Sequence, residues 1–487
     1  MQAAMPASPS RSVAIARPDG RVGVPALGDA RMVGSWSSGP VGDTPGRPLD
    51  STLMPSLRAP RGTRDLLPAE RAAFGRLERI AADLAVRYGY RPIETPLFEQ
   101  GAVFERGIGA ATDVVEKELF RVAPSRGEER ERWALRPEAT AGIVRAYVEH
   151  GLATWPQPVK VALTGPMFRY DRPQAGRYRQ FWQWDVEAIG DPGPAVDAEL
   201  VELGLRFYRE VGLADVEVLL NSIGDPACRP PYIAELRAYY GRHETALPEV
   251  ERERLATNPL RLLDSKDPAM AALNAAAPRI TERLCAPCAD HFAAVRAHLD
   301  ALGIGYRVEP ALVRGLDYYT RTAFEFYRSG AEGQQQALGG GGRYDGLVQL
   351  LGGRPTPGIG FALGLDRVVL ALAADGAAEA EVPHPVAVVV GADPSATAER
   401  LRVATELRAA GLAVGAELAR RKLGRQLEAA VREGAHYAVI LGDELADGHV
   451  QLRDLWAASQ KLVPLADLAA LLRRKGGVSP QPREGSR

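Results

Sequence analysis

Polar side chains that could bind a charged ligand gather between Val161 and Gly190. The two-residue period of an extended chain places Gln183, Asp185 and Glu187 on one face. The other face is apolar, with Trp182, Trp184 and Val186. The preceding part is rich in arginine: Arg169, Arg172, Arg177 and Arg179. Carboxylates on an apolar strand cost desolvation energy unless a polar group meets them, and guanidinium groups bind phosphate or carboxylate through paired hydrogen bonds. The pattern predicts two strands and a loop that bind a polar ligand, with a solvated hairpin as the alternative.

A second candidate binding group lies in the run 135–140. Pro137 suits the first turn of a helix, and apolar residues at helical spacing follow it. Glu138 has two interpretations: it caps this helix and offsets the helix dipole, or it binds a ligand, since a carboxylate with the Thr140 hydroxyl two residues on suits an ammonium ion. The sequence leaves both open.

Glycine-rich segments follow further along the chain. Four consecutive glycines, 339–342, could form a phosphate loop, but no Lys-Ser or Lys-Thr pair follows them. The alternative is a tight turn with close approach of the backbone. Residues 358–363 predict a strand, and residues 364–367 predict the start of a helix. The glycine spacing there lacks the preceding βαβ unit of a dinucleotide site, which excludes that function.

The three cysteines could take part in a metal site. Cys285 and Cys288 form a CxxC pair, and His291 with the distant Cys228 would complete four zinc ligands. A second CxxC pair is missing, so ordinary thiols are favoured and no protein-bound metal is predicted. So few cysteines in a long chain also argue against a disulfide framework and favour a reducing, cytoplasmic location.

The elements that position these residues must belong to a multidomain chain. A length of 487 residues exceeds one compact core and predicts two or three domains. The chain is 46% hydrophobic and 25% charged, which is ordinary for a globular protein, and no run of about 18 apolar residues predicts a membrane span. A net charge of −1 excludes a uniformly basic nucleic-acid coat, so RNA binding would need local patches.

The N-terminal part changes character near residue 58. Residues 1–57 are rich in Pro, Gly, Ser and Ala and predict a disordered tail, and their acidic residues argue against a targeting peptide. Apolar residues at helical spacing then predict a helix that ends near Gly89: Phe74, Leu77, Ile80 and Leu84. Residues 90–96 predict an extended segment, because a residue before proline avoids the helical region. Residues from about 225 to 308 predict a largely helical region.

The C-terminal part alternates strands with helices. After a Gly- and Ala-rich linker at 373–382, buried strands are predicted at 385–390 and 437–441. This pattern predicts a compact α/β domain over residues 383–475, followed by a disordered tail at 476–487. A basic cluster before one of its helices suits phosphate contacts, although a solvated charge run is the common alternative: Arg420, Arg421, Lys422 and Arg425.

Together these motifs resemble those of the histidyl-tRNA synthetases, a family of class II aminoacyl-tRNA synthetases. Residues 168–181, FRYDRPQAGRYRQF, resemble motif 2, the first helix with the strand ending at Pro96 resembles motif 1, and residues 358–367 resemble motif 3. Residues 312–320, LVRGLDYYT, and 340–347, GGGRYDGL, match the two histidine-specific peptides. Asp171 and Asp366 stand where many family members have glutamate.

The resemblance implies an α+β fold, with a class II antiparallel sheet and flanking helices over 58–372, an inserted helical domain, and a C-terminal α/β anticodon-binding domain. It implies catalytic roles for Arg314, Arg169 and Arg367. It implies histidine binding by Glu138, Thr140, Gln183, Glu187, Tyr318, Tyr319 and Tyr344. It implies ATP binding by Arg169, Asp171, Arg177, Tyr178, Phe181 and Arg367. It implies tRNA contacts at Arg172, Gln174, Arg420, Arg421, Lys422 and Arg425.

The activity that the resemblance implies is ligation of L-histidine to tRNA(His), with ATP as substrate, Mg²⁺ accompanying ATP, and a homodimer formed through motif 1. The alternative is a catalytically inactive paralogue that senses histidine as a regulatory subunit of ATP phosphoribosyltransferase. Such proteins usually lose the arginines and the C-terminal domain, whereas both are present here. A third possibility is an RNA-binding protein without ligation activity.

Overall fold

The computed structural model of the chain describes residues 57–109, 112–123, 132–263, 265, 267–313, 315–329, 337–376, 382–393 and 395–475. The predicted tails at 1–57 and 476–487, except for Leu57, lie outside these ranges, as do Arg314 and part of the predicted linker. Within the ranges, no helix is both long and apolar enough to cross a membrane.

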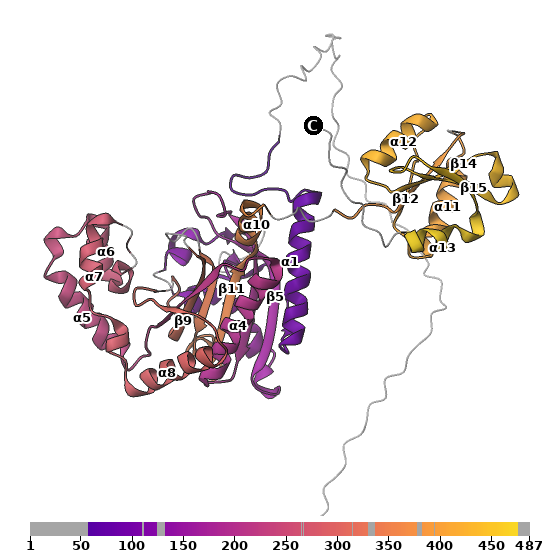
Figure 1. Cartoon of the computed structure of the whole chain (residues 1–487). Coiled ribbons are helices and arrows are strands. Elements are labelled where there is room, and N and C mark those ends of the chain that lie inside the picture. Colours follow the sequence, from indigo (N-terminus) through magenta and orange to yellow (C-terminus); the bar gives the residue numbers. More distant parts are fainter. Residues whose placement is uncertain are drawn as a thin grey trace, which may run out of the picture. The chain divides into compact units, whose positions relative to one another are not determined.

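Eight strands of the described ranges form one sheet in the order β1-β5-β6-β11-β10-β9-β7-β8. Figure 1 labels three of them, β5, β9 and β11. The six inner strands of the sheet are antiparallel to one another. The short edge strands β1 and β8 run parallel to β5 and β7, respectively. The strands are β1 (Arg91–Pro92), β5 (Val159–Phe168), β6 (Gln180–Ile189), β7 (Val216–Ser222), β8 (Arg307–Val308), β9 (Thr320–Arg328), β10 (Ala337–Arg343) and β11 (Gly358–Gly364). Phe168 pairs with Gln180, so the predicted strands on either side of the arginine-rich loop are confirmed.

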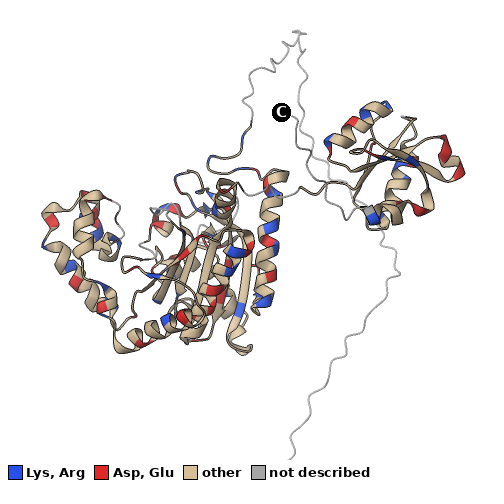
Figure 2. Cartoon of the chain, viewed as in Figure 1, with Lys and Arg blue, Asp and Glu red and all other residues tan. Residues whose placement is uncertain are grey.

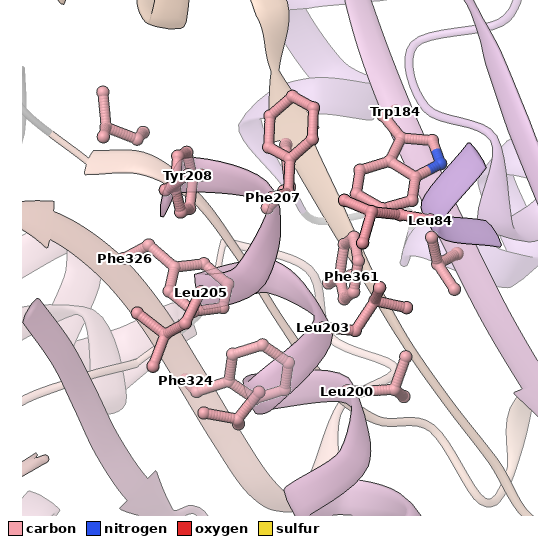
Figure 3. Close-up of a cluster of buried hydrophobic side chains, with 14 of the residues drawn as sticks. Leu84, Trp184, Leu200, Leu203, Leu205, Phe207, Tyr208, Phe324, Phe326 and Phe361 are labelled. Atoms are coloured by element: carbon pink, nitrogen blue, oxygen red, sulfur yellow. The ribbon is translucent and has the colours of Figure 1, made fainter. Parts of the chain in front are cut away.

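Helices cover one face of this sheet and share a hydrophobic core with it. They are α1 (Pro68–Arg87), α4 (Pro194–Val211), α8 (Ala286–Ala301) and α10 (Leu365–Ala374). Trp184 of β6 lies in this core, with its ring centroid 5.0 Å from that of Phe207 and 5.4 Å from that of Phe361 (Figure 3). The tryptophan face of β6 is therefore the core face, as predicted. The predicted first helix is α1, whose Phe74, Leu77 and Leu84 are buried while Ile80 is partly buried.

Smaller elements pack into a second core that includes residues of β5, β6 and β9. A three-stranded sheet has the order β2-β4-β3, with β2 (Phe98–Gln100), β3 (Arg121–Val122) and β4 (Trp133–Leu135). The helices are α2 (Gly101–Ile108), α3 (Thr140–Glu149) and α9 (Leu347–Leu350), with a π-helical turn η1 (Val114–Glu118) and a 3-10 turn η2 (Leu152–Thr154). The predicted helix is α3, but it begins at Thr140 with Ala139 as its N-cap residue, so Pro137 precedes the helix and does not lie in its first turn as predicted.

The glycine run 339–342 is neither a turn nor a phosphate loop. It forms the middle of β10, which pairs with β11 on one side and β9 on the other. A Cβ at Gly342 would lie 2.5 Å from Thr322 O and 2.9 Å from Tyr319 Cδ1, and a Cβ at Gly339 would lie 2.7 Å from Ala362 O. Close approach of neighbouring groups, within a strand rather than a turn, therefore excludes side chains here.

Between β7 and α8 the chain forms a helical insertion. It contains α5 (Arg229–Gly241), α6 (Glu249–Thr257) and α7 (Ala271–Ala276), with 3-10 turns η3 (Glu244–Ala246), η4 (Pro259–Leu262), η5 (Pro268–Met270) and η6 (Ile280–Glu282). The insertion has a core of its own, which includes Tyr232, Leu236, Tyr240, Leu262 and Met270. The largely helical character predicted for this region is confirmed.

The C-terminal part is a separate α/β unit of sheet and helices. Its five strands have the order β13-β12-β14-β15-β16, with β12, β13 and β14 parallel and β15 and β16 antiparallel. The strands are β12 (Ala387–Gly391), β13 (Val414–Ala416), β14 (Tyr437–Leu441), β15 (His449–Asp454) and β16 (Gln460–Pro464). The helices are α11 (Thr397–Ala409), α12 (Leu423–Arg432) and α13 (Leu465–Lys475), with the 3-10 turn η8 (Asp443–Asp447). The two strands predicted from apolar runs correspond to β12 and β14.

Candidate active site

A buried cluster of carboxylates and tyrosines, called the carboxylate pocket here, lies on the face of β6 opposite the tryptophans. Glu187 is fully buried and accepts a hydrogen bond on each oxygen: 2.5 Å from Thr140 Oγ1 and 2.6 Å from the Tyr344 hydroxyl. Tyr318 packs beside Tyr344, with ring centroids 6.0 Å apart, and beside Tyr319 at 4.6 Å. The structure thus brings together five of the residues predicted to bind histidine.

Glycines on the neighbouring strands make room for this pocket. Gly360 of β11 pairs with Glu187, and a Cβ at Gly360 would lie far inside van der Waals contact with Glu187 Oε2. A Cβ at Gly358 would overlap the ring of Tyr344 in the same way. The missing side chains therefore allow Glu187 and Tyr344 to lie against the sheet.

Burial controls the ionisation of Glu187. Desolvation and, to a smaller extent, the nearby carboxylate of Glu138 raise its pKa to about 8, because the opposing hydrogen bonds from Thr140 and Tyr344 offset only part of the shift. At neutral pH the carboxyl group of the unliganded protein is therefore mostly protonated. A ligand that donates a hydrogen bond or brings positive charge would reverse this balance.

The same face of β6 carries polar atoms without partners among the described residues. They are Gln183 Oε1 and both carboxylate oxygens of Asp185, which is fully buried. Burial raises the pKa of Asp185 well above its ordinary value, and the carboxylates of Glu187 and Glu138 raise it further. Buried acceptors without donors are rare in folded proteins, so these atoms indicate that a ligand with hydrogen-bond donors binds here.

The structure shows the helix-capping contact of Glu138, one of the two interpretations that the sequence left open. Its Oε1 accepts a hydrogen bond of 2.9 Å from the Ala141 amide and so caps α3. Its Oε2 lies 3.5 Å from the Tyr318 hydroxyl, at the pocket. The side chain is buried, and desolvation raises its pKa although the Ala141 amide opposes the shift. Helix capping therefore holds a carboxylate at the edge of the pocket.

A cluster of arginines adjoins the carboxylate pocket. Arg169 lies after the end of β5, donates from Nε to Pro137 O at 2.9 Å, and stacks with its Cζ 5.4 Å from the centroid of the Phe181 ring. Arg367 of α10 donates to the carbonyls of Gly176 and Ala337. Burial, Arg177 and Arg169 together lower the pKa of Arg367. These guanidinium groups repel one another, and a polyanion that binds between them would relieve this repulsion.

Two aspartates that replace glutamate in the resemblance have structural contacts. Asp171 Oδ2 pairs with Arg177 NH1 at 3.3 Å within the loop between β5 and β6. Asp366 is buried and accepts a hydrogen bond of 2.7 Å from the Trp182 amide, which fastens α10 to β6. Arg172 and Gln174, predicted to contact tRNA, are exposed in the same loop.

The sequence interpretation missed two arginines that position this site. Arg64, in the segment before α1, pairs with Asp366 Oδ1 at 2.8 Å and places its Cζ 3.8 Å from the centroid of the Tyr178 ring. Arg136 is fully buried and donates to Pro166 O at 3.0 Å and Thr95 O at 2.8 Å, so it joins the Glu138 segment to β5. Residues next to each of these arginines belonged to predicted motifs or elements. The distant partners of the two arginines become visible only in the fold.

The proposed set of four zinc ligands is not the one that the structure assembles. His291 donates to or accepts from Asp197 Oδ2 at 2.8 Å, within a buried network in which Asp197 also pairs with Arg343 and Thr322. The three cysteines instead gather around Asp225. His291 is therefore paired with Asp197 and is not among the side chains that surround the three sulfur atoms.

The basic cluster of the C-terminal unit is exposed at the N-terminal end of α12. Arg421 and Arg425 form surface ion pairs with Glu417 at 3.6 Å and Glu428 at 2.8 Å. Buried Gln426 bonds both the amide and the carbonyl of Gly391 and also donates to Arg421 O, so the loop before α12 is fastened to β12. The charges of α12 are visible in Figure 2.

An antiparallel sheet that joins a carboxylate pocket to an arginine cluster, with a separate C-terminal α/β unit, is the architecture of a class II aminoacyl-tRNA synthetase. The family model described as histidyl-tRNA synthetase matches residues 62–368, and the one described as anticodon binding domain matches residues 385–475. The chain belongs to the histidyl-tRNA synthetase family.

Individual relatives agree with this assignment. The histidine–tRNA ligase of Anaeromyxobacter dehalogenans is 48% identical over 411 residues, which cover 84% of this chain and 98% of the relative. That of Desulforudis audaxviator is 46% identical over 417 residues, covering 85% and 98%. The crystal structure of apo S. aureus histidyl-tRNA synthetase is 33% identical, has a TM-score of 0.71, and covers 86% of this chain and 100% of its own.

Proposed function

We propose that the chain ligates histidine to tRNA(His) in two steps. The carboxylate oxygen of histidine attacks the α-phosphorus of ATP, the bond to the β-phosphate breaks, and histidyl-adenylate and pyrophosphate form. A hydroxyl of the terminal ribose of the tRNA then attacks the histidyl carbonyl, and AMP leaves. Positioning and electrostatic stabilisation suffice for both steps, without a covalent enzyme intermediate.

One observation carries the proposal: an acidic pocket and an arginine cluster lie on neighbouring strands, joined by Glu138 and Arg169. Arg169 donates to Pro137 O, next to the Glu138 that reaches the pocket. An amino acid whose side chain and ammonium group occupy the acidic pocket would present its carboxylate toward the arginines. That is the geometry that attack on a bound triphosphate requires.

The imidazole recognition is assigned to the buried end of the pocket. Imidazole has two ring nitrogens that need partners, and Glu187 with Tyr319 and Tyr344 supplies oxygen atoms for them. Glu138, Thr140 and Gln183 bind the main-chain groups of histidine, and Tyr318 lines the pocket beside them. The unpartnered Gln183 Oε1 supports this assignment, because an ammonium group would satisfy it.

ATP is assigned to the arginine cluster. Arg169 and Arg367 bind its phosphates, Arg177 and Asp171 shape the loop above it, and Tyr178 and Phe181 cover the nucleotide. Glu118 and Glu325 are carboxylates with electrostatic contacts to these arginines, and such oxygen ligands suit the Mg²⁺ that accompanies ATP. Mg²⁺ would neutralise charge on the phosphates.

Arg314 is assigned a catalytic role at the α-phosphate, on the strength of the LVRGLDYYT resemblance. The residues on both sides of it are held by the catalytic domain, because Asn221 Nδ2 donates to Leu312 O at 2.9 Å and the Asp317 amide donates to Ile108 O at 3.0 Å. Its positive charge would stabilise the negative charge that develops during attack.

The tRNA is assigned to two surfaces. Arg172 and Gln174 lie in the exposed loop after β5 and would contact the end that accepts histidine. Arg420, Arg421, Lys422 and Arg425 would contact phosphates near the anticodon, where the N-terminal end of α12 adds its own positive dipole.

The chain is further proposed to work as a homodimer in the cytoplasm. Leu97 and Phe98, which follow the edge strand β1, are 43% and 50% exposed, and large apolar side chains at a sheet edge favour burial against a partner. All three cysteines are free, which suits a reducing compartment.

ATP–pyrophosphate exchange, measured without RNA and screened over all amino acids, tests the proposal. Exchange is expected with L-histidine alone. Exchange with another amino acid would refute the pocket assignment, and no exchange with any would favour the regulatory paralogue. The present data give that alternative no support, because the curated relatives are histidine–tRNA ligases and the C-terminal unit is intact.

A further inference from the structure

The chain crosses twice between the catalytic sheet and the helical insertion, and all three cysteines lie at these crossings. The outgoing crossing follows β7 and carries Asp225 and Cys228, whereas the returning crossing enters α8 and carries Cys285 and Cys288. These four residues are called the neck cluster here. Since the insertion has a separate core, the neck determines how firmly it is held.

The neck cluster has the composition and size of a metal site. One carboxylate oxygen of Asp225 and the three Sγ atoms all lie within 4.8 Å of one another. In a tetrahedral zinc site, Zn–S bonds of about 2.3 Å place the sulfur atoms about 3.8 Å apart. Side-chain rotations that move each ligand atom by less than about 1 Å would therefore bring all four atoms to bonding distance of one ion.

The surrounding backbone holds these ligands in place. The Ala227 amide donates to Asp225 Oδ1 at 2.9 Å, and the Asp225 amide donates to Cys228 Sγ at 3.3 Å. Gly224 has a φ of +67°, and a Cβ at this position would lie 2.7 Å from Cys228 Sγ. A tight turn is thus wrapped around one sulfur atom, as it is in many zinc-binding loops.

The starts of two helices fix two of the sulfur atoms. Cys228 is the N-cap residue of α5 and Cys285 is that of α8, so both side chains lie where the chain enters a helix. Arg321 NH2 lies 3.6 Å from Asp225 Oδ2 and offsets part of the negative charge.

We propose that the neck cluster binds one thiophilic divalent cation, Zn²⁺, through Asp225, Cys228, Cys285 and Cys288, and that the ion clamps the two chain crossings together. Three sulfur ligands and one oxygen select zinc over Mg²⁺ or Ca²⁺, which prefer oxygen alone. The ion is structural, because all four positions are taken by protein ligands.

The clamp also reaches the histidine-binding peptide. Arg229, next to Cys228, donates to Ile223 O at 3.2 Å and to the carbonyl of Tyr319. The Arg321 amide donates to Gly224 O at 2.7 Å. An ion at the neck would therefore stabilise the backbone that presents Tyr319 to the pocket, a consequence that rests on the proposed function.

Metal analysis of the full chain tests the proposal. Protein purified with zinc present and then dialysed against metal-free buffer is expected to retain about one zinc per chain. Cys285→Ser and Asp225→Asn are expected to lower retained zinc by at least about tenfold, since even outer partners of metal ligands change affinity that much. The control is Glu282→Gln, an exposed carboxylate close to Cys285 in sequence that is not part of the cluster, and it should retain zinc.

A second measurement needs no variant. The chain has 3 cysteines in total, so any thiolate signal comes from the neck cluster. Adding Co²⁺ to chelator-treated wild type is expected to give thiolate-to-cobalt charge-transfer absorption, and zinc should protect all three thiols from a disulfide reagent. Absence of zinc in wild type together with absence of this absorption would overturn the proposal, as would a disulfide between two of the cysteines in protein purified under reducing conditions.

Discussion

Histidine binding is expected to release a proton from Glu187. In the unliganded protein burial raises the pKa of Glu187 to about 8. At pH 7 the group is then about nine-tenths protonated, and at pH 8 about half. An imidazole N–H needs an acceptor, so bound histidine favours the ionised carboxylate. Binding should release about 0.9 proton from this group at pH 7 and about 0.5 at pH 8.

The same shift sets how affinity changes with pH. A pKa of about 8 makes ionisation of Glu187 unfavourable below pH 8, by a free energy that grows by roughly 1 kcal/mol for each pH unit. The sign follows from the raised pKa: the contribution of Glu187 to histidine affinity increases with pH and levels off above about pH 8. Free imidazole titrates near pH 6.5, and burial also raises the pKa of Asp185 and of Glu138, so Glu187 is identified by the difference between wild type and a variant at this position between about pH 6.5 and 8.

Calorimetric titration in buffers of different ionisation enthalpy measures the released protons directly. Glu187→Gln retains the shape of the side chain without its titration, so it should lose this proton release, and its histidine affinity should depend less on pH than that of wild type between about pH 6.5 and 8. Glu149→Gln, an exposed carboxylate of α3, is the matched control and should behave as wild type. Equal proton release by wild type and Glu187→Gln would refute the assignment of Glu187 to the imidazole.

Further predictions concern single parts of the chain. Gly360→Ala should raise the KM for histidine far more than that for ATP, because its Cβ displaces the Glu187 carboxylate; equal effects in pyrophosphate exchange would contradict this. Asp197→Asn removes the fully buried one of the two carboxylates that pair with buried Arg343 and leaves only Asp345, so it should lower the unfolding free energy by about 3 kcal/mol in urea titrations, and a loss below about 1 kcal/mol would be inconsistent. Arg314→Ala should slow single-turnover adenylation by about 100-fold or more, with ground-state binding retained; a wild-type rate would exclude the role. A chain ended after Asp375 should still form histidyl-adenylate but charge tRNA poorly, with a flatter salt dependence of RNA binding; undiminished charging by a truncated chain shown by sedimentation to be dimeric would rule out the assignment of residues 383–475.

The sequence predicted the elements whose signal is local. The alternation along residues 180–189 predicted both faces of β6, because a core face and a ligand face impose opposite chemistry on successive residues. Helical spacing predicted α1, because a helix that packs on a core repeats its apolar residues with the period of the helix. The residues assigned to histidine then follow from where the strand and the start of α3 place them, and Thr140, Glu187 and Tyr344 do meet.

Contacts between distant segments were not predictable in this way. Four consecutive glycines have low strand propensity, yet 339–342 forms a central strand, in which neighbouring groups occupy the space of a Cβ at Gly339, Gly341 and Gly342. Arg64 meets Tyr178 and Asp366 only through the fold. Asp225 carries no metal-binding signature of its own, so the sequence suggested His291 as the fourth ligand, although the fold pairs that residue with Asp197.

The glycines under the pocket also limit how its specificity can change. Gly358 and Gly360 allow Tyr344 and Glu187 to lie where they do by contributing no side-chain atoms. Every substitution of glycine adds atoms, so no replacement at these positions could enlarge the pocket, and each would push the recognising groups toward the ligand. Peptide atoms also have no rotamers with which to adapt to another amino acid. A variant that accepts a larger substrate therefore requires substitution of Glu187 or Tyr344 themselves. An inhibitor that contacts the backbone of the two glycines would bind the part of the site where the fewest mutations could give resistance.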